Sequence, residues 1–571
     1  MFINSILLIS CCLVFVLFIT FFDIPLSNSI QNESLNNETF QSESIKIIDK
    51  EITLKTLPAP STIVNNTSPL SLTLINKEII DKEESTNETL QNFYPKSAFS
   101  TDLESQLLEL PLLNKRWYGL DIYSAAEVGK ANQFLRPINP PDVSIAVGKD
   151  HIAQVVHSSI QIWNKNGLTL DKKLLHDLFN ISKDHYITDP MILYDNSSDR
   201  WFATIVDGGK EEIKNGSSYY TCLPFCKVII AVSNNTDPTL NWSLFSINAS
   251  KVENFPDIPK IAVSKFNLIM ATKEFQVQPS INESKSIHRT YIINKNFIDE
   301  IASTMNLSSY SFTDPAYPIP YINPTNWSST ITLFKENKTD VFSPVSRLKI
   351  TDYWTSSFTH TNYSITKKFV KIPTLFPAPK FKQPLLDSNE KEELTILSAI
   401  RNDTSLWIAM HSACQPAFIS DNSCINILRF DKIIGTGQNP ERSNYTYSLV
   451  ENTQFHIDNT DVYYPAIGIS KEGKVIFISG FSNSTIFPSL RISHLVAENQ
   501  TSDRVLIFGS AVNNSTSYGD YFGSAIDPIN GTVWLSGQYV DQSIPIPSQI
   551  PMEQRDKLRD KTWATIIANV S

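Results

Sequence analysis

The chain contains the stretch Pro-Asp-Val-Ser-Ile-Ala-Val at residues 141–147, followed after a short turn by the apolar run 151–156. The repeated pattern begins with a cluster of Pro, Asp or aromatic residues and continues with alternating apolar residues. In its complete form a polar turn and a second apolar run follow. It returns at 189–205, 256–263, 464–469 and 519–526. Alternation with period two between turn residues predicts β-hairpins. A hairpin that recurs every few tens of residues is typical of radial or stacked all-β architectures.

The spacing of the repeats predicts one blade for each. Asp142 and Asp189 are 47 residues apart, Asp189 and Asp257 are 68 apart, and Asp257 and Asp314 are 57 apart. Four-stranded propeller blades take roughly 40 to 50 residues before loop insertions. With a further hairpin at 394–410, we expect an all-β fold, a single β-propeller of seven four-stranded blades, with six or eight as alternatives. A last strand at 562–567 is expected to pair with an early strand at 117–123 and close the ring.

Composition excludes some classes of partner. The chain has 571 residues, of which 41% are hydrophobic and 11% aromatic, as expected for a globular protein. Its formal net charge of −10 leaves no basic face for a phosphate backbone. We therefore expect no nucleic-acid partner.

The N-terminus predicts export. Residues 1–26 form an apolar segment, read either as a cleaved signal peptide or as an uncleaved helical membrane anchor. Residues 27–110 are rich in Asn, Ser, Glu, Thr and Lys, which predicts a disordered, glycosylated stalk. The propeller is expected over 111–571. These assignments place it on the extracellular face of the cytoplasmic membrane, tethered by its N-terminal segment, or secreted.

Glycosylation and cysteine patterns agree with export. The chain has 24 Asn-x-Ser/Thr sequons, against roughly ten expected by chance, although an Asn-rich proteome would also raise this number. The sites expected to carry glycans within the propeller include Asn180, Asn241, Asn326, Asn402 and Asn530. Four cysteines lie outside the apolar segment, as the short-range pairs Cys222/Cys226 and Cys414/Cys424. Two such pairs favour disulfides over a zinc site, because few histidines lie near them.

A family resemblance supports the fold. Pro140-Pro141-Asp142 with Ala146-Val147-Gly148, Asp189-Pro190 with the segment 194–202, and Gly519-Asp520-Tyr521 with the segment 527–534 carry it. In this order the motifs resemble a broad family of secreted bacterial and archaeal β-propeller proteins, distantly sialidase-like and mostly without an assigned activity. The resemblance covers roughly 117–571 and implies an exported, surface-associated propeller.

One set of carboxylates is a candidate site. Asp142, Asp189, Asp257, Asp314 and Asp520 each precede the first apolar strand of a blade. If that strand lines the channel, the carboxylates gather at one mouth, where their oxygens would suit Ca²⁺ or Mg²⁺. The metal site expected on this basis comprises Asp142, Asp189, Asp257 and Asp520, with Ca²⁺ as its cofactor. The alternative is structural, with each Asp accepting N–H bonds within its own turn.

No catalytic constellation is recognisable. Arg136, Arg347, Arg401 and Arg429 are too few and too scattered to assign as a sialidase arginine triad. The histidines, among them His151, His157, His176 and His185, form no metal-ligand pattern. We therefore expect a binding module of the cell envelope whose partners are envelope proteins or glycans. The alternative is a sialidase-like, carbohydrate-active hydrolase with its site at the channel mouth.

Overall fold

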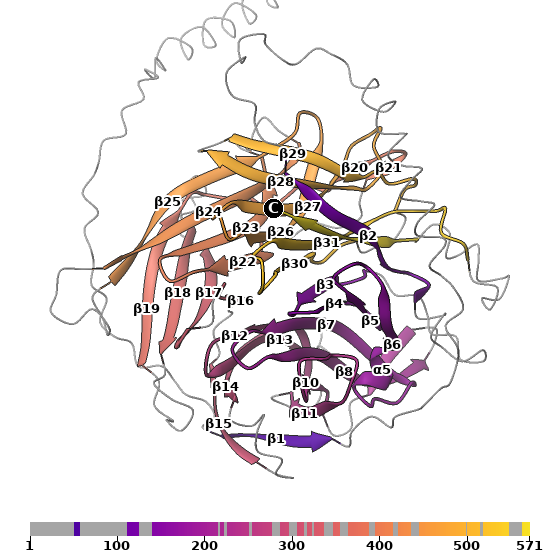
Figure 1. The fold of residues 1–571 in the computed structure, drawn as a ribbon, viewed down its shortest axis with the longest axis vertical. Coiled ribbons are helices and arrows are strands. Elements are labelled where there is room, and N and C mark those ends of the chain that lie inside the picture. The colour runs from indigo at the N-terminus through magenta and orange to yellow at the C-terminus, as the bar shows by residue number, and fades with distance from the viewer. Residues whose placement is uncertain are drawn as a thin grey trace, which may run out of the picture. The chain divides into compact units, whose positions relative to one another are not determined.

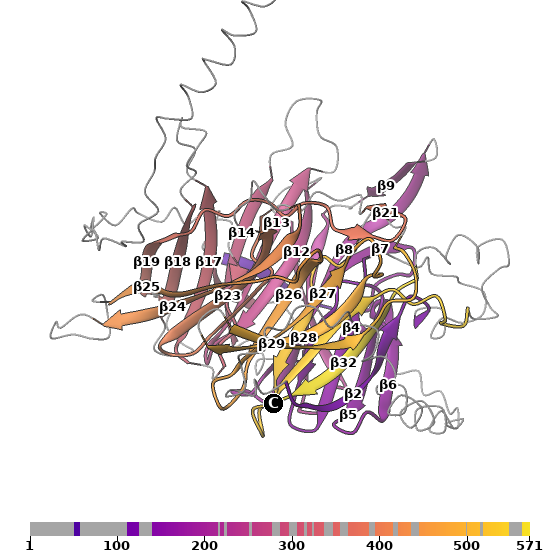
Figure 2. The same cartoon turned by 90° about the horizontal axis from the view of Figure 1, so that it is seen from above.

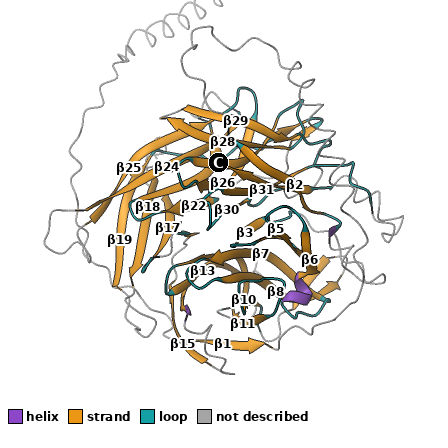
Figure 3. Ribbon diagram, viewed as in Figure 1, coloured by secondary structure: helices purple, strands orange, loops and turns teal. Residues whose placement is uncertain are grey.

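The architecture is a ring of seven four-stranded antiparallel sheets, as predicted. A computed structural model describes residues 51–57, 111–124, 140–214, 217–221, 225–249, 254–276, 286–295, 305–312, 317–322, 325–335, 346–354, 364–387, 394–414, 421–434, 445–497, 500–513, 518–546 and 562–571. Strands make up almost all of the described elements, and α5 (Leu175–Leu178) is a single helical turn after the first blade (Figure 3).

The first four blades follow one another in sequence. Blade 1 comprises β3 (Ser144–Val147), β4 (His151–Val156), β5 (Ser159–Asn164) and β6 (Thr169–Leu174). Blade 2 comprises β7 (His185–Asp195), β8 (Arg200–Lys214), β10 (Lys227–Ser233) and β11 (Trp242–Asn248), with β9 (Ser217–Thr221) paired to β8. Blade 3 comprises β12 (Asn254–Val263), β13 (Asn267–Gln276), β14 (Ile287–Asn294) and β15 (Met305–Phe312). Blade 4 comprises β16 (Tyr317–Pro318), β17 (Trp327–Lys335), β18 (Ser346–Trp354) and β19 (Ser364–Ile372). Of these, β17, β18 and β19 lie side by side in Figure 2.

The last three blades complete the ring. Blade 5 comprises β22 (Ser398–Arg401), β23 (Ser405–Ala413), β24 (Ser423–Ile434) and β25 (Tyr445–Phe455). Blade 6 comprises β26 (Asp461–Ile469), β27 (Val475–Ser482), β28 (Ser489–Ala497) and β29 (Gln500–Ile507). Blade 7 comprises β30 (Gly523–Ile526), β31 (Val533–Tyr539), β32 (Ala564–Val570) and, from the other end of the chain, β2 (Leu113–Asp121). The innermost strands of neighbouring blades contact one another around a common centre (Figure 1).

Two elements lie outside this pattern. Strand β1 (Glu51–Leu57) pairs with the outermost strands β11 and β15 and so joins blades 2 and 3. The hairpin β20 (Lys382–Gln383) and β21 (Leu386–Asp387) lies in the connection from blade 4 to blade 5. The predicted anchor and, apart from β1, the predicted stalk lie outside the described residues. Among the residues that are described, no helix is long and apolar enough to cross a membrane.

The hydrophobic core lies in layers between neighbouring blades. One layer between blades 1 and 2 includes the buried residues Ala153, Ile205 and Trp242. Equivalent layers of Ile, Val, Leu and aromatic side chains separate the later blades. Because each strand shows both of its faces to a neighbouring blade, nearly every residue of β23, β26 and β27 is buried.

The recurring sequence phrase is a backbone irregularity that lies just before the innermost strand in blades 1 and 7 and within it in blades 2, 3 and 6. In five blades a residue there has a left-handed backbone, with φ between 46° and 57°: Asp142, Asp189, Ile258, Tyr464 and Asp520. The strand ladder is shifted beside three of them, between Thr188 and Met191 and at the matching points of β12 and β26. Asp tolerates this conformation better than most residues, whereas Ile and Tyr adopt it at a cost in strain. The irregularity therefore belongs to the architecture and turns the chain into the channel wall.

The ring is closed by a pair of strands from opposite ends of the chain. β2 pairs with β32 in antiparallel register, with Trp117 opposite Ile567, as the sequence predicted. Gln154 of blade 1 secures the junction: its Nε2 donates to Ser536 Oγ at 2.6 Å, and its Oε1 accepts from the Leu120 N–H at 2.8 Å. This buried amide therefore links β4, β31 and β2.

Gln154→Leu is expected to lower the free energy of unfolding by about 2–3 kcal/mol, because it leaves buried donors without their partner. Gln161→Leu is the matched control. Gln161 lies directly opposite on β5, and its Nε2 donates to Thr169 Oγ1 at an exposed position. Urea denaturation monitored by tryptophan fluorescence measures both. Equal effects of the two substitutions would contradict the role of Gln154 in closure.

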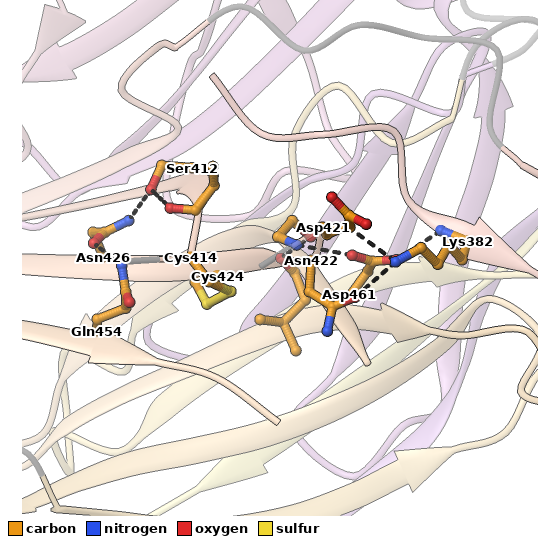
Figure 4. The surroundings of a disulfide bond; sticks show 12 residues. Lys382, Ser412, Cys414, Asp421, Asn422, Cys424, Asn426, Gln454 and Asp461 are labelled. Carbon is orange, nitrogen blue, oxygen red and sulfur yellow. Dashed lines mark hydrogen bonds between the residues drawn. A yellow bond between two sulfur atoms is a disulfide. The ribbon is translucent and has the colours of Figure 1, made fainter. Parts of the chain in front are cut away.

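The disulfide between Cys414 and Cys424 is present, as predicted. It joins the end of β23 to the start of β24, close to Lys382 of the inserted hairpin (Figure 4). Beside it, Asn426 Nδ2 donates to Ser412 Oγ at 2.6 Å, and the Lys382 N–H donates to Asp461 at 2.7 Å. Cys226 is also disulfide-bonded, whereas Cys222 lies outside the described residues.

The double variant Cys414→Ala/Cys424→Ala is expected to lose about 2–3 kcal/mol of stability, the value for a cross-link that closes a loop of ten residues. Denaturation of the unmodified protein with and without a reductant provides the comparison. Reductant should destabilise the unmodified protein more than the double variant. An unchanged midpoint in the double variant would contradict a stabilising role for this bond.

Candidate functional site

The structure brings four of the five predicted aspartates together. Asp142 of the segment before β3, Asp189 of β7, Asp257 of β12 and Asp520 of the segment before β30 interact electrostatically with one another. They come from blades 1, 2, 3 and 7, which are consecutive around the ring. We call this set the acid cluster. Asp314 lies outside the described residues.

The acid cluster extends from the interior to the surface. Asp142 is 2% exposed and Asp189 is 4% exposed. Asp257 is half-buried, and Asp520 is exposed to solvent. The carboxyl groups of Asp142 and Asp189 are therefore removed from water, whereas those of Asp257 and Asp520 can be reached by a dissolved molecule.

Lys260 lies at the centre of this arrangement. It belongs to β12 of blade 3, yet its Nζ lies 4.0 Å from the centre of the Tyr521 ring, which comes from blade 7. The Tyr317 ring of blade 4 lies 5.4 Å from the same atom. Tyr521 itself points towards the Pro190 carbonyl of blade 2, with 3.5 Å between the oxygens. The side chains of Lys260 and Tyr521 therefore cross the channel close to its axis.

Hydrogen bonds connect the cluster across blades. Asp189 Oδ2 accepts from the Ile258 N–H of the next blade at 3.2 Å, and Asp189 also shares a hydrogen bond with Asp257. Asp142 Oδ2 lies 3.3 Å from His157 Nδ1, and Asp142 Oδ1 is buried without a hydrogen-bond partner. Asp189 thus bonds to a neighbouring blade, not only to its own turn. A buried carboxyl oxygen without a partner is costly for the fold.

Burial and mutual repulsion perturb the ionisation of the whole cluster. Burial raises the pKa of Asp142 well above its ordinary value, and the charges of Asp520, Asp189 and Asp257 raise it further, in that order, while Lys260 opposes them. Burial is also the largest cause of the raised pKa of Asp189 and of Asp257. The buried carboxyl groups therefore hold protons at pH values where an exposed Asp is ionised.

The two basic groups beside the cluster shift in the opposite direction. Burial lowers the pKa of Lys260 to about 8, although the charges of Asp189, Asp520 and Asp142 act to raise it. Burial likewise lowers the pKa of the neighbouring His157 to about 4. Near neutral pH the imidazole is therefore uncharged. Perturbed ionisation concentrated at one point is characteristic of functional sites.

A cavity of about 620 Å³ lies in the central channel, and Lys260 is one of the residues that line it. The innermost strands of all seven blades contribute to its walls, in which Ile, Val and Tyr residues alternate with Ser, Asn and Lys residues. Lys260, Tyr521 and Tyr317 line it at the end nearest the acid cluster. At the opposite end it is lined by hairpin turns, including Asn196, Asn402 and Gly531. The cavity is therefore a chamber of mixed polarity, with Lys260 at one end.

The other predicted site residues lie elsewhere. His176 Nε2 lies 3.0 Å from the His185 carbonyl, and His151 faces Asp237 at 3.7 Å. Arg401 donates to Asp352 at 3.0 Å between blades 4 and 5, and Arg429 pairs with Asp431. No three His, Cys, Asp or Glu side chains in the described parts of the chain are arranged to hold a metal ion. Calcium binding by the four aspartates stays a prediction.

The predicted glycosylation sites lie in turns, mostly at one end of the ring. Asn241, Asn326, Asn402 and Asn530 precede second or fourth strands of their blades, at the end opposite the acid cluster. Asn180 follows α5 in the connection between blades 1 and 2. Asn180, Asn241 and Asn530 are exposed, and the other two are half-buried. Their modification stays a prediction.

Sequence reasoning missed Lys260 and Tyr521. The one available signal was the segment Asp257–Val263, in which Lys260 is a charged residue within an otherwise apolar innermost strand. Period-two alternation would have assigned that lysine to a solvated position, because a sequence does not show that the strand faces a channel.

No family model matches the chain, and no curated protein matches it. Several solved structures are similar in outline. A protein of unknown function from Dyadobacter fermentans is 9% identical, with a TM-score of 0.35, and the match covers 68% of this chain and 96% of that one. Extracellular domains 1–2 of Drosophila Semaphorin 1b are 8% identical, with a TM-score of 0.33, covering 81% and 87%. Trypanosoma rangeli sialidase in complex with sialic acid is 9% identical, with a TM-score of 0.31, covering 75% and 60%.

These similarities are too weak to carry an argument about the site. The protein is defined by its own strand pairing as a seven-bladed β-propeller in which a channel lysine interacts with the carboxyl groups of three blades.

Asp142→Asn is expected to raise the midpoint of thermal unfolding at pH 7 by about 2–4 °C. A carboxyl group whose folded-state pKa lies above its unfolded value near 3.9 destabilises the fold increasingly as the pH rises between the two values. The variant's advantage should therefore disappear towards pH 4. Asp199→Asn is the control, because a hydrogen bond from Lys149 lowers the pKa of Asp199. Removing the Asp199 charge should therefore leave the stability of the protein unchanged or reduce it. A destabilised Asp142→Asn protein at pH 7 would contradict the assignment.

Proposed function

We propose that the protein is an exported, cell-surface β-propeller that binds a small ligand in its central channel. The observation that carries the proposal is the chamber of about 620 Å³ that ends at Lys260. Ligand pockets commonly enclose ~300–1,000 Å³ and combine apolar walls with a few polar groups of perturbed pKa. This chamber has the volume of such a pocket and, at Lys260, a polar group of perturbed pKa.

The composition of the walls supports a ligand with both apolar and polar groups. Ser144, Asn196, Ser398, Asn402 and Lys471 line the chamber beside Ile, Val and Tyr residues. Polar groups of a ligand would find hydrogen-bond partners there, and its apolar parts would be removed from water.

The sialidase-like alternative has less support. The resemblance implies a cluster of arginines, but Arg401 and Arg429 are engaged by Asp352 and Asp431 away from the acid cluster. The cation that interacts with Asp142 and Asp189 is Lys260. We therefore treat the protein as a binding module, not as a glycosidase.

Two features support export to the cell surface. The disulfide between Cys414 and Cys424 would persist in an oxidising compartment and be reduced in most cytoplasms. The sequons in exposed turns, among them Asn241 and Asn530, would be accessible to a glycosylation system. Attachment through the N-terminal segment would keep the propeller at the outer face of the membrane.

The proposal is tested with N-phenyl-1-naphthylamine, a neutral apolar dye whose fluorescence rises when it leaves water. We expect saturable binding of one dye per propeller. Asn196→Trp should weaken it by roughly tenfold or more, about 1.4 kcal/mol, because Asn196 is exposed in a turn that lines the chamber and an indole added there narrows it. Leu240→Phe is the control, since Leu240 is exposed in the turn between β10 and β11. No saturable binding, or equal loss in both variants, would contradict a channel site.

A further inference from the structure

We propose that the ligand of the channel chamber is a small organic anion, and that Lys471 binds its charged group at the end of the chamber that is lined by hairpin turns. This inference rests on the proposed function and specifies the chemical class of the ligand. It is carried by the hydrogen bonds and ion pairs of the polar residues that line the chamber, because these occupy the other charged groups and leave the Lys471 amine unpaired.

Three charged residues line the chamber, and the protein itself balances the charges of two of them. The three are Lys260, Asp527 and Lys471. Lys260 interacts electrostatically with three aspartates of the acid cluster. Asp527 is buried, and its Oδ2 accepts from Lys165 Nζ at 2.5 Å and from Trp534 Nε1 at 3.3 Å. Neither Lys260 nor Asp527 therefore needs a charge from the ligand.

The Lys471 amine is not balanced in this way. Lys471 is exposed in the turn between β26 and β27, and its amine makes no hydrogen bond or ion pair with any residue that the structure describes. The adjacent Glu472 interacts with it electrostatically, but that carboxylate accepts from Ser470 Oγ at 2.9 Å and does not line the chamber. An anion in the chamber would therefore gain the attraction of Lys471 without displacing a bonded protein group.

Contacts with blade 7 hold the base of Lys471 at the chamber wall. Its N–H donates to the Gly531 carbonyl at 2.9 Å. The two turns also pack closely, since a Cβ added at Gly531 would lie 2.5 Å from Lys471 Cβ. The backbone is therefore fixed beside the chamber, and the flexible stem of the side chain is free to follow a ligand.

Two amide groups at the same end can donate to the same anion. Asn402 of blade 5 lines the chamber, and its Oδ1 accepts from the N–H groups of Thr404 at 3.0 Å and Ser405 at 2.8 Å, which leaves Nδ2 as its free donor. A glycan on Asn402 would leave one N–H on that nitrogen. The side chain of Asn196 of blade 2 makes no hydrogen bond within the described residues.

The hydroxyl groups of the chamber are in a different state. Each Ser and Tyr hydroxyl that lines it is hydrogen-bonded within the protein, as Ser524 Oγ is to the Ile467 carbonyl at 2.7 Å. The groups without partners are therefore one ammonium and the donors of two amides. Hydrogen bonds from such donors are stronger to an anion than to a neutral acceptor, which favours an anionic ligand.

The test compares 2-naphthoate, an anion, with 2-naphthamide, a neutral molecule of nearly the same shape, as competitors of the dye at pH 7. We expect naphthoate to displace the dye at about three- to tenfold lower concentration, as for a partly exposed ion pair with hydrogen bonds. Added salt should reduce this preference, because it screens exposed charges. Lys471→Met should abolish the preference, and Lys471→Arg should retain it.

Lys265→Met is the matched control. Lys265 is exposed in the turn between β12 and β13, at the same end of the ring, and does not line the chamber. The substitution removes the same charge, so it should leave the preference for naphthoate unchanged.

The outcomes separate this inference from the proposed function. If the dye binds saturably but naphthoate displaces it no better than naphthamide, the anionic class is refuted and the channel site stands. A preference that persists in folded Lys471→Met protein, or that Lys265→Met lowers equally, would also overturn the inference. If neither the dye nor the two competitors bind, both proposals fail.

Discussion

The pairing of β2 with β32 is the constraint on which the centre of the molecule depends. An open ring would leave two sheet edges exposed and would let blades 7 and 1 separate. Asp142 belongs to blade 1 and Asp520 to blade 7, so these two carboxyl groups lie together only because the ring is closed. The closure therefore both protects the fold and builds the site.

A buried acid cluster is a poor way to stabilise a protein. Each of the groups Asp142 and Asp189 loses its water and faces other carboxyl groups, which is why their pKa values rise. A hydrophobic side chain at the same position would pack without this penalty, as Tyr464 does in blade 6. An arrangement that weakens the fold in this way is more readily explained by binding or chemistry than by architecture.

Much of the fold was predictable because its causes are local. Alternating apolar residues, turn residues and repeat spacing identify hairpins, and closure follows from the need to cover edges. The pairing of Cys414 with Cys424 was predictable for the same reason, since the two cysteines are close in sequence.

The site was only partly predictable because its causes are not local. The gathering of Asp142, Asp189, Asp257 and Asp520 was predicted from their place in the repeated phrase, although Asp189 and Asp257 lie within β7 and β12 and not before them. The role of Lys260 was not, because it depends on Tyr521 reaching across from blade 7. The left-handed backbone at Ile258 likewise has no local sequence signature, since β-branched residues disfavour it. The inserted hairpin β20–β21 is held by distant residues such as Asp461 and Asn513, which no pattern links to it.

The most direct test of the account is a titration of the Lys260 amine by nuclear magnetic resonance, in protein labelled with ¹³C and ¹⁵N at lysine. The spectrum of Lys260→Arg identifies the signal. An amine held across the channel and beside the acid cluster should titrate with a pKa of about 8. A midpoint at the ordinary lysine value near 10.4 would show that the amine lies in open water, and would contradict the arrangement on which the proposed site rests.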